Sequence, residues 1–261
     1  MTRYIVTNVY DGLNLRASPS TNATILGSMP FATVCELLED TGTRWKKVRA
    51  PVNGTRTVGF ASDTYLTEAK SDAVVRLIAS VMHYWTLFDR GRGRENVQPF
   101  KNEVLKMWDD LGGGRPPNNN TSHEDWPWSA AGMSAFIRRA GGYTGFKFSA
   151  GHSVYIHDSV VKMKANQPAP FWGFRITEKK PEVGDLIAQW RKTRRTYDFA
   201  AVEDSFNSHT DVVCQIVNGT ARAIGANVPT DTVGVKVYRL TVQGFLSGER
   251  NEIAIMKNMA Q

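Results

Sequence analysis

The sequence has 261 residues, 41% hydrophobic and 22% charged, which is an ordinary balance for a folded protein and excludes a wholly disordered chain. Its length allows one large domain or two smaller domains with separate cores. The formal net charge of +7 predicts attraction to an anionic partner, and nucleic acid, a membrane surface and an acidic cell-wall polymer all fit that charge.

The first residues, 1–12, alternate like a strand and lack the charged-then-apolar layout of a secretory signal. The most apolar helical run, residues 73–88, is too short to span a bilayer and contains Arg76. We therefore expect synthesis in the cytoplasm without a signal peptide, and no membrane insertion. A site of action outside the cell would then require delivery by another system.

Cysteine and histidine usage predicts neither a disulfide framework nor a metal or other cofactor. The two cysteines, Cys35 and Cys214, both stand in apolar strand patterns and are expected to be small core residues. The five histidines show no metal-ligand spacing such as HExxH.

Residues 1–67 break into short alternating runs separated by turn residues, a pattern that predicts a small all-β barrel. The segment resembles the bacterial SH3 domain, although Phe60 stands where that family more often has Trp. The resemblance implies a module that binds cell-wall peptides or serves as a spacer. It is carried by Leu13, Asn14, Leu15, Arg16, Pro19, Gly27, Trp45, Val48, Gly59, Tyr65 and Leu66.

Residues 70–261 change to a helical period and then return to alternation. Helices followed by a run of strands predict an α+β domain with an antiparallel sheet. Ser71 is a plausible N-cap of the first helix, and Pro181 precedes the strands. The expected helices are 71–91, 101–114, 128–140 and 151–167, and the expected strands are 183–190, 209–217, 221–227, 233–242 and 252–258.

Ser129 opens the third expected helix, at its positive end, where exposed backbone N–H groups can stabilise a developing oxyanion. That position suits a nucleophile, and it equally suits an ordinary capping serine. The residues alone favour the cap.

His209 begins a strand in which alternation places Asp211 on the same face. A histidine at such a place suits a general base. A tight turn at 218–220 folds Asn227 back beside the start of this strand, where its amide could hold the imidazole in the useful tautomer. The alternative is that Asn227 is only a turn residue before Pro229.

Four motifs in order resemble the papain-like cell-wall amidases and peptidases of the NlpC and CHAP types. They are WSAAGMSAFIRRAG at 128–141, FKFSAGHSVYI at 146–156, GDLI at 184–187 and SHTDVV at 208–213. In that group an Ala-Gly pair follows the catalytic Cys by eleven and twelve residues, and counting back from Ala140 leads to Ser129. An uncharacterised bacterial branch of the group is similar in having serine there.

The resemblance implies a peptidoglycan hydrolase in which Ser129 attacks an amide, His209 acts as base and then acid, and Asn227 orients it. Because a serine needs more help than a thiolate, a carboxylate is expected near the base, from Asp211 or Asp125.

Three further residues and one basic loop have two interpretations each. The resemblance covers His152, which either contacts substrate or forms a local hydrogen bond at a helix start. Trp126 and Trp128 either line a substrate groove or pack beside the helix. The basic loop 191–195 is either solvated or a contact for anionic glycan.

Three functions follow from these patterns. The first is cleavage of an amide in peptidoglycan, with that polymer or another anionic wall polymer as partner, by a phage lysin, a phage-particle enzyme or a delivered toxin. The second is a catalytically inactive protein that binds the wall or sits in a particle. Nucleic-acid binding ranks last, because the basic residues do not gather on one helix or on an aromatic-rich sheet.

Overall fold

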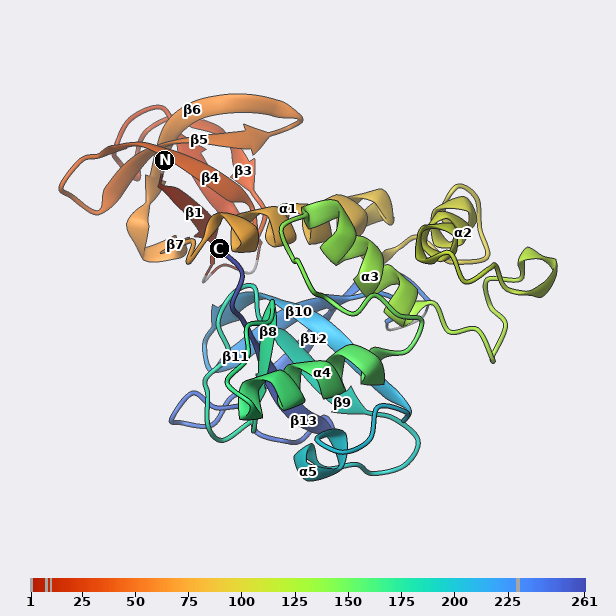
Figure 1. Ribbon diagram of the computed structural model, residues 1–261. Coiled ribbons are helices and arrows are strands. Elements are labelled where there is room, and N and C mark those ends of the chain that lie inside the picture. The colour runs from red at the N-terminus through yellow and green to blue at the C-terminus, as the bar shows by residue number, and fades with distance from the viewer. Residues whose placement is uncertain (1, 8, 10, 229–230) are drawn as a thin grey trace.

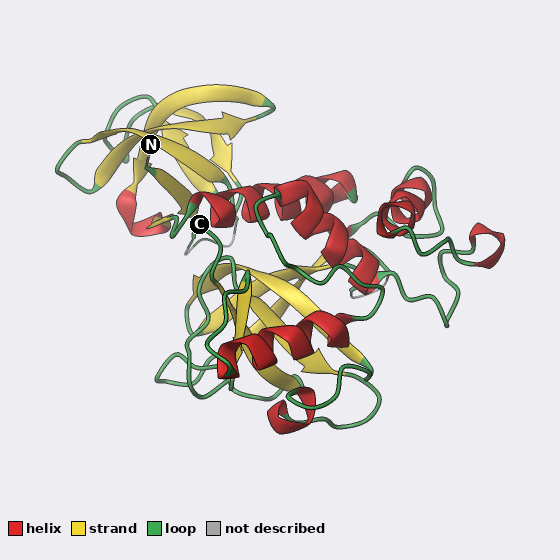
Figure 2. Ribbon diagram, viewed as in Figure 1, coloured by secondary structure: helices red, strands yellow, loops and turns green. Residues whose placement is uncertain are grey.

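A computed structural model describes the chain except for residues 1, 8, 10 and 229–230. The described part is a mixed α+β fold with two antiparallel sheets and five α-helices (Figures 1 and 2). The expected α+β class with antiparallel pairing is therefore confirmed. None of the helices in these described ranges has both the length and the apolar character needed to cross a bilayer.

The first sheet contains seven short strands in the order β3-β2-β6-β5-β4-β1-β7. It curls on itself: a Cβ placed on Gly27 of β3 would overlap Val52 of β5, a strand that is not its neighbour in the sheet. The short alternating runs of residues 1–67 thus form the β-structure that they predict. The strands are β1 (Arg3–Val6), β2 (Leu13–Arg16), β3 (Ile25–Met29), β4 (Val34–Asp40), β5 (Trp45–Val52), β6 (Thr55–Ser62) and β7 (Leu66–Glu68).

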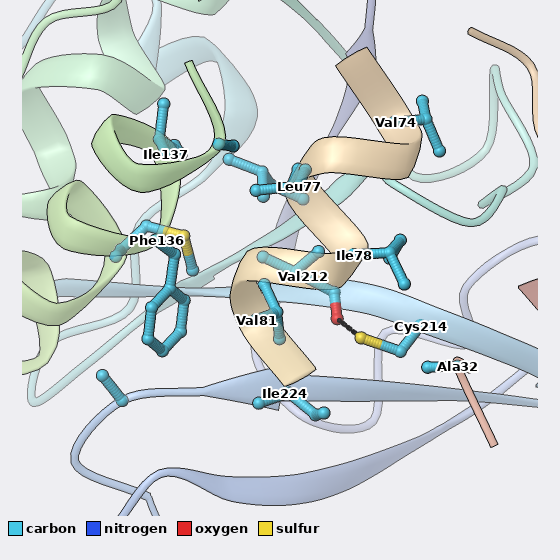
Figure 3. Packing of buried hydrophobic residues seen from close by; sticks show 14 of the residues in the cluster. Ala32, Val74, Leu77, Ile78, Val81, Phe136, Ile137, Val212, Cys214 and Ile224 are labelled. Carbon is cyan, nitrogen blue, oxygen red and sulfur yellow. Dashed lines mark hydrogen bonds between the residues drawn. The ribbon is translucent and has the colours of Figure 1, made fainter. Parts of the chain in front are cut away.

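Helix α1 (Asp72–Leu87) runs between the two sheets (Figure 1). It begins as expected, since the Oγ of Ser71 accepts a hydrogen bond of 3.3 Å from the backbone N–H of Val74. One side of α1 packs on the second sheet, where Ile78 and Val81 lie near Val212 (Figure 3). Figure 3 labels Ala32, Val74, Leu77, Ile78, Val81, Phe136, Ile137, Val212, Cys214 and Ile224 in this cluster.

The second sheet has the order β12-β11-β10-β9-β13-β8 and carries helices on the side of α1. Strand β8 and the single turn α5 are additions to the expected elements, since FWGF and YDFA are too short for a clear period. The strands are β8 (Phe171–Phe174), β9 (Leu186–Trp190), β10 (Ser208–Val217), β11 (Thr220–Gly225), β12 (Gly234–Arg239) and β13 (Glu252–Asn258). The remaining helices are α2 (Phe100–Leu111), α3 (Ser129–Ala140), α4 (His152–Lys164) and α5 (Tyr197–Ala200).

The two thiols are core residues, as the sequence predicts. Cys35 and Cys214 are both fully buried and free, and burial raises the pKa of each thiol to about 12. Cys214 donates only to the carbonyl of Val212, two residues away in the same strand (Figure 3). Because a nucleophilic cysteine requires an accessible thiolate, neither residue suits that role.

Candidate active site

The start of helix α3 is anchored by Trp128, the residue immediately before Ser129. The indole is fully buried and stacks on Phe88, with ring centroids 5.5 Å apart. Its Nε1–H donates to the carboxylate of Glu95, a group that burial keeps at a raised pKa. These contacts fix the first turn of α3 and hence the position of Ser129.

The hydroxyl of Ser129 binds a histidine and does not cap the helix. The N-cap position belongs to Trp128, and no side chain there accepts a helix N–H. The Oγ of Ser129 lies 2.8 Å from Nε2 of His152, the first residue of α4. The capping interpretation of Ser129 is therefore wrong.

His152 is held from its other side by two hydroxyl groups. Its Nδ1 lies 2.9 Å from Oγ1 of Thr210 on β10 and also meets the hydroxyl of Tyr155, one turn along α4. Both hydroxyls can accept a hydrogen bond, so a proton on Nδ1 is satisfied there. In that tautomer Nε2 carries the lone pair that faces Ser129, which is the arrangement a general base requires.

Electrostatics favour the neutral imidazole. Burial, reinforced by repulsion from His209, holds the pKa of His152 well below its ordinary 6.5. Burial also raises the pKa of the Tyr155 phenol, so its proton stays in place. A neutral His152 between two protonated hydroxyls can take the proton of Ser129.

A second imidazole, that of His209, stands against the first, with ring centroids 4.9 Å apart. Nε2 of His209 is 2.8 Å from the carboxylate of Asp211, and both side chains are almost completely buried. Burial lowers the pKa of His209, although Asp211 opposes this effect. The two site histidines are thus both neutral at neutral pH.

Asp211 is held as a carboxylate at the centre of the buried cluster. Lys236 of β12 places its ammonium 2.8 Å from this carboxylate, and the hydroxyl of Tyr238 donates to it as well. Burial alone would raise the pKa of Asp211, but the hydrogen bond from His209 and the ammonium of Lys236 hold it below the usual range. The carboxylate of Asp211 thus places a buried negative charge near His152, with His209 standing between the two residues.

Two glycines let the elements of the site approach one another. A Cβ on Gly225, the last residue of β11, would overlap Oδ1 of Asp211 and lie 3.1 Å from Nε2 of His209. A Cβ on Gly132 of α3 would overlap the side chain of Ala226, just after β11. The absence of side chains at these two positions is therefore a condition for the observed geometry.

The structure brings four of the predicted site residues together, namely Ser129, His152, His209 and Asp211. Their pairing differs from the expected one, because the hydroxyl of Ser129 meets His152 and not His209. The exposed side chain of Asp125 makes no hydrogen bond to either histidine among the described residues. Asp211 is the carboxylate of the cluster.

Asn227 does not orient His209, whose Nε2 is taken by Asp211. The ladder of β10 and β11 pairs Val212 with Ile224, and its extension would set residue 227 opposite residue 209. However, β11 ends at Gly225, and Asn227 turns into the left-handed region with φ 58°. No hydrogen bond joins its side chain to His209 within the described part of the chain, so the orienting role expected for Asn227 is corrected.

The two tryptophans on either side of Pro127 differ in how deeply they are buried. Trp128 has no exposed surface, so the prediction that it lines a substrate groove does not agree with its burial. Trp126 is half-buried and packs edge-on against Trp108, with centroids 5.3 Å apart. Its contact with substrate stays a prediction.

Sequence reasoning missed the supporting residues of the cluster. Thr210, Tyr155, Lys236 and Tyr238 each occur in an ordinary helix or strand pattern with no motif of their own. Only the one-turn spacing of Tyr155 from His152 was a usable signal. The described residues contain no group of three or more His, Cys, Asp or Glu side chains placed to hold a metal ion.

The fold and this cluster define an α+β protein with a serine–histidine pair buried at a helix start. The chain belongs to the family described as "Uncharacterized protein conserved in bacteria (DUF2272)", whose model matches residues 98–258. That range contains helices α2 to α5, the whole second sheet and every residue of the buried cluster described above, namely Ser129, His152, Tyr155, His209, Thr210, Asp211, Lys236 and Tyr238.

Two solved structures are similar to the chain over nearly its whole length, both from Trichomonas vaginalis. The structure of NlpC2 is 13% identical, covers 99% of this chain and 73% of its own, and has a TM-score of 0.27. The structure of NlpC1 is 14% identical, covers 98% of this chain and 70% of its own, and has a TM-score of 0.28. No curated protein matches the chain.

Proposed function

We propose that the protein is a hydrolase that cleaves an amide bond in peptidoglycan through an acyl-enzyme on Ser129. The observation that carries this proposal is the 2.8 Å contact between Oγ of Ser129 and Nε2 of His152 at the N-terminus of α3. The substrate class is supported by the resemblance of the motifs around Ser129, His152 and His209 to those of papain-like cell-wall amidases. The bond would be one in the stem peptide or cross-link.

In the proposed reaction His152 takes the role that the sequence gives to His209, because His152 is the histidine in contact with the nucleophile. Its Nε2 accepts the proton of Ser129 as Oγ attacks the carbonyl carbon, and the backbone N–H groups at the start of α3 stabilise the oxyanion. His152 then returns the proton to the leaving amine. A water molecule attacks the ester by the same route and releases Ser129.

The second imidazole has a supporting role in this proposal. Because His209 is hydrogen-bonded to Asp211 and abuts the ring of His152, the Asp211 carboxylate is the negative charge closest to the imidazolium that forms on His152. In serine hydrolases a carboxylate of this kind stabilises that imidazolium. Thr210 fixes the tautomer.

The test is release of amide-cleaved fragments from defined muropeptides by the full chain and by single variants. We expect Ser129→Ala and His152→Gln each to lose about 10³-fold or more of kcat/KM. His157→Gln is the matched control, since His157 lies on the same helix but its side chain is hydrogen-bonded, among the described residues, to the carbonyl of Ala200 alone. Full activity in Ser129→Ala would show that the hydroxyl of Ser129 takes no part in the reaction.

Burial of the pair favours a second candidate function, a protein that binds the wall without cleaving it. Ser129 is only 9% exposed and His152 only 4%, so a substrate carbonyl has little access to the hydroxyl. This candidate predicts that the parent chain and Ser129→Ala bind peptidoglycan equally and that neither cleaves it. Activity gained in Ser129→Cys would instead show a competent site with a weak nucleophile.

The proposal includes the division of the chain and its setting. Residues 1–67 would act as an SH3-like targeting domain and residues 70–261 as a papain-like catalytic domain. The protein would act at the bacterial cell wall after delivery, as a phage lysin, a phage-particle enzyme or an injected toxin. A fragment of residues 70–261 that keeps cleavage but loses wall binding would support this division.

A further inference from the structure

A wide groove lies between the first sheet and helix α1, and neither Ser129 nor His152 is among the residues that line it. Its volume is about 1370 Å³, larger than the roughly 300–1,000 Å³ that encloses a small molecule. A cavity of this size suits a segment of a longer chain lying between two walls.

Arginine dominates the charge of the groove. Five arginines line it, against the two carboxylates of Asp11 and Glu36. Two of the five are already paired: Arg49 lies 2.8 Å from Glu36, and Arg3 lies 3.7 Å from Asp72. The other three are Arg56, Arg76 and Arg90, whose side chains form no hydrogen bond or salt bridge with another described residue.

These arginines approach the groove from both walls. Arg56 is exposed at the start of β6, on the side of the first sheet, and Arg90 is exposed just after α1, on the other side. Arg76, on the first turns of α1, is half-buried, and its guanidinium lies against Gly142 just after α3. A bound chain would therefore meet guanidinium groups on two sides, and guanidinium is the side chain best suited to bidentate contact with phosphate.

The uncharged lining indicates what kind of anion fits. Among the described residues that line the groove the one aromatic ring is that of His83, so successive nucleic-acid bases find no row of stacking platforms there. Aliphatic side chains such as Val75, Met82 and Leu87 supply the remaining surface and suit a flexible carbon backbone. Together the charges and this surface favour a polyanion without rings.

We propose that this groove binds a polyol phosphate chain, a polymer of phosphodiester-linked polyols, through Arg56 and Arg90. The inference deepens the proposed function, on which it rests for the setting of such a polymer at the cell wall. It requires no cleavage, so it can be measured with Ser129→Ala protein. Loss of binding and loss of hydrolysis are thus separate results.

The experiment measures binding of a defined glycerol phosphate oligomer to the full chain by calorimetry at several salt concentrations. We expect Arg56→Glu/Arg90→Glu to weaken binding about tenfold or more and to reduce the salt slope by about 1 to 2. Lys147→Glu/Lys179→Glu is the matched control, with the same change of net charge at two exposed positions that do not line the groove. It should change the affinity less than about threefold.

Three results would overturn the inference. One is an equal loss in the two double variants, which would indicate a nonspecific response to net charge. Another is an undiminished affinity in Arg56→Glu/Arg90→Glu. The third is equally tight, equally variant-sensitive binding of a single-stranded oligonucleotide or of phosphatidylglycerol vesicles, which would assign the groove to nucleic acid or to a lipid surface.

Discussion

The exchange of Gly225 for alanine tests the geometry of the buried cluster most directly. The added Cβ would overlap Oδ1 of Asp211 and lie 3.0 Å from its Cγ and 3.1 Å from Nε2 of His209. Asp211 cannot move away easily, because Lys236 and Tyr238 hold its other oxygen and it has no exposed surface. The substitution therefore forces either a backbone shift or the rupture of a buried ion pair.

The expected cost follows from those two responses. Overpacking of a tight interior costs about 1–3 kcal/mol, and leaving one partner of a buried ion pair costs about 3–5 kcal/mol. We expect Gly225→Ala to lower the free energy of unfolding by about 3 kcal/mol, a change of about 10²-fold in the folded-to-unfolded ratio. Amide cleavage should fall with it, since His209 is displaced.

Urea unfolding followed by tryptophan fluorescence measures this change. Gly113→Ala is the matched control, because Gly113 has no atom within 4 Å of the added Cβ and no positive φ. A Gly-to-Ala change at such a place is neutral or slightly stabilising. If Gly225→Ala were as stable as Gly113→Ala, within about 0.5 kcal/mol, the tight contact between Gly225 and Asp211 would be refuted.

Three further predictions concern pH and the anchoring of α3. The pKa of Asp211 is lower in the folded state than its ordinary 3.8, so its contribution to stability is present above about pH 4 and is lost as the pH falls further. In urea unfolding, the free energies of Asp211→Asn and the parent should therefore differ most at neutral pH and converge in acid. The pKa of His152 lies well below 6.5, so the acidic limb of kcat/KM should fall below that of an ordinary histidine base, and a limb at or above pH 6.5 would exclude His152 as the base. Trp128→Phe keeps the stacking on Phe88 but removes the hydrogen-bond donor to the buried Glu95 carboxylate, and should lower the free energy of unfolding by about 1–3 kcal/mol. An unchanged midpoint in thermal or urea unfolding would show that this hydrogen bond does not stabilise the fold.

Local patterns predicted most of the fold because single elements are specified by their own residues. The Ser71 cap, the apolar stripe of α1 and the glycine after α2 are all local signals, and each element lies where those signals place it. The turn between β10 and β11 is equally local, since Asn218 and Gly219 both have positive φ. Strand β8 lacked such signals, because four residues with a glycine among them carry no period.

The site was predictable only where one element determined the geometry. Alternation along β10 sets His209 and Asp211 on one face, and they do form a hydrogen bond. The pairing of Ser129 with His152 depends on how helices α3 and α4 pack relative to each other, and no local sequence pattern predicts that packing. The orienting role predicted for Asn227 was wrong for a related reason. The register of β10 and β11 was predictable, but the residue at which β11 ends was not.

The order of burial within the cluster bears on its chemistry more than burial itself does. Ser129 is 9% exposed, His152 4% and Thr210 fully buried, so Ser129 is the least buried residue of the three. Nε2 of His152 lies 2.8 Å from Oγ of Ser129, and the two hydroxyl residues that hold the imidazole, Tyr155 and Thr210, are more deeply buried than Ser129. A network built only to stabilise the core has no need of that sequence of groups, and replacing buried ionic residues by apolar ones is often neutral or stabilising. This order of burial is therefore a structural argument for the roles proposed above, with Ser129 as the nucleophile and His152 as the base.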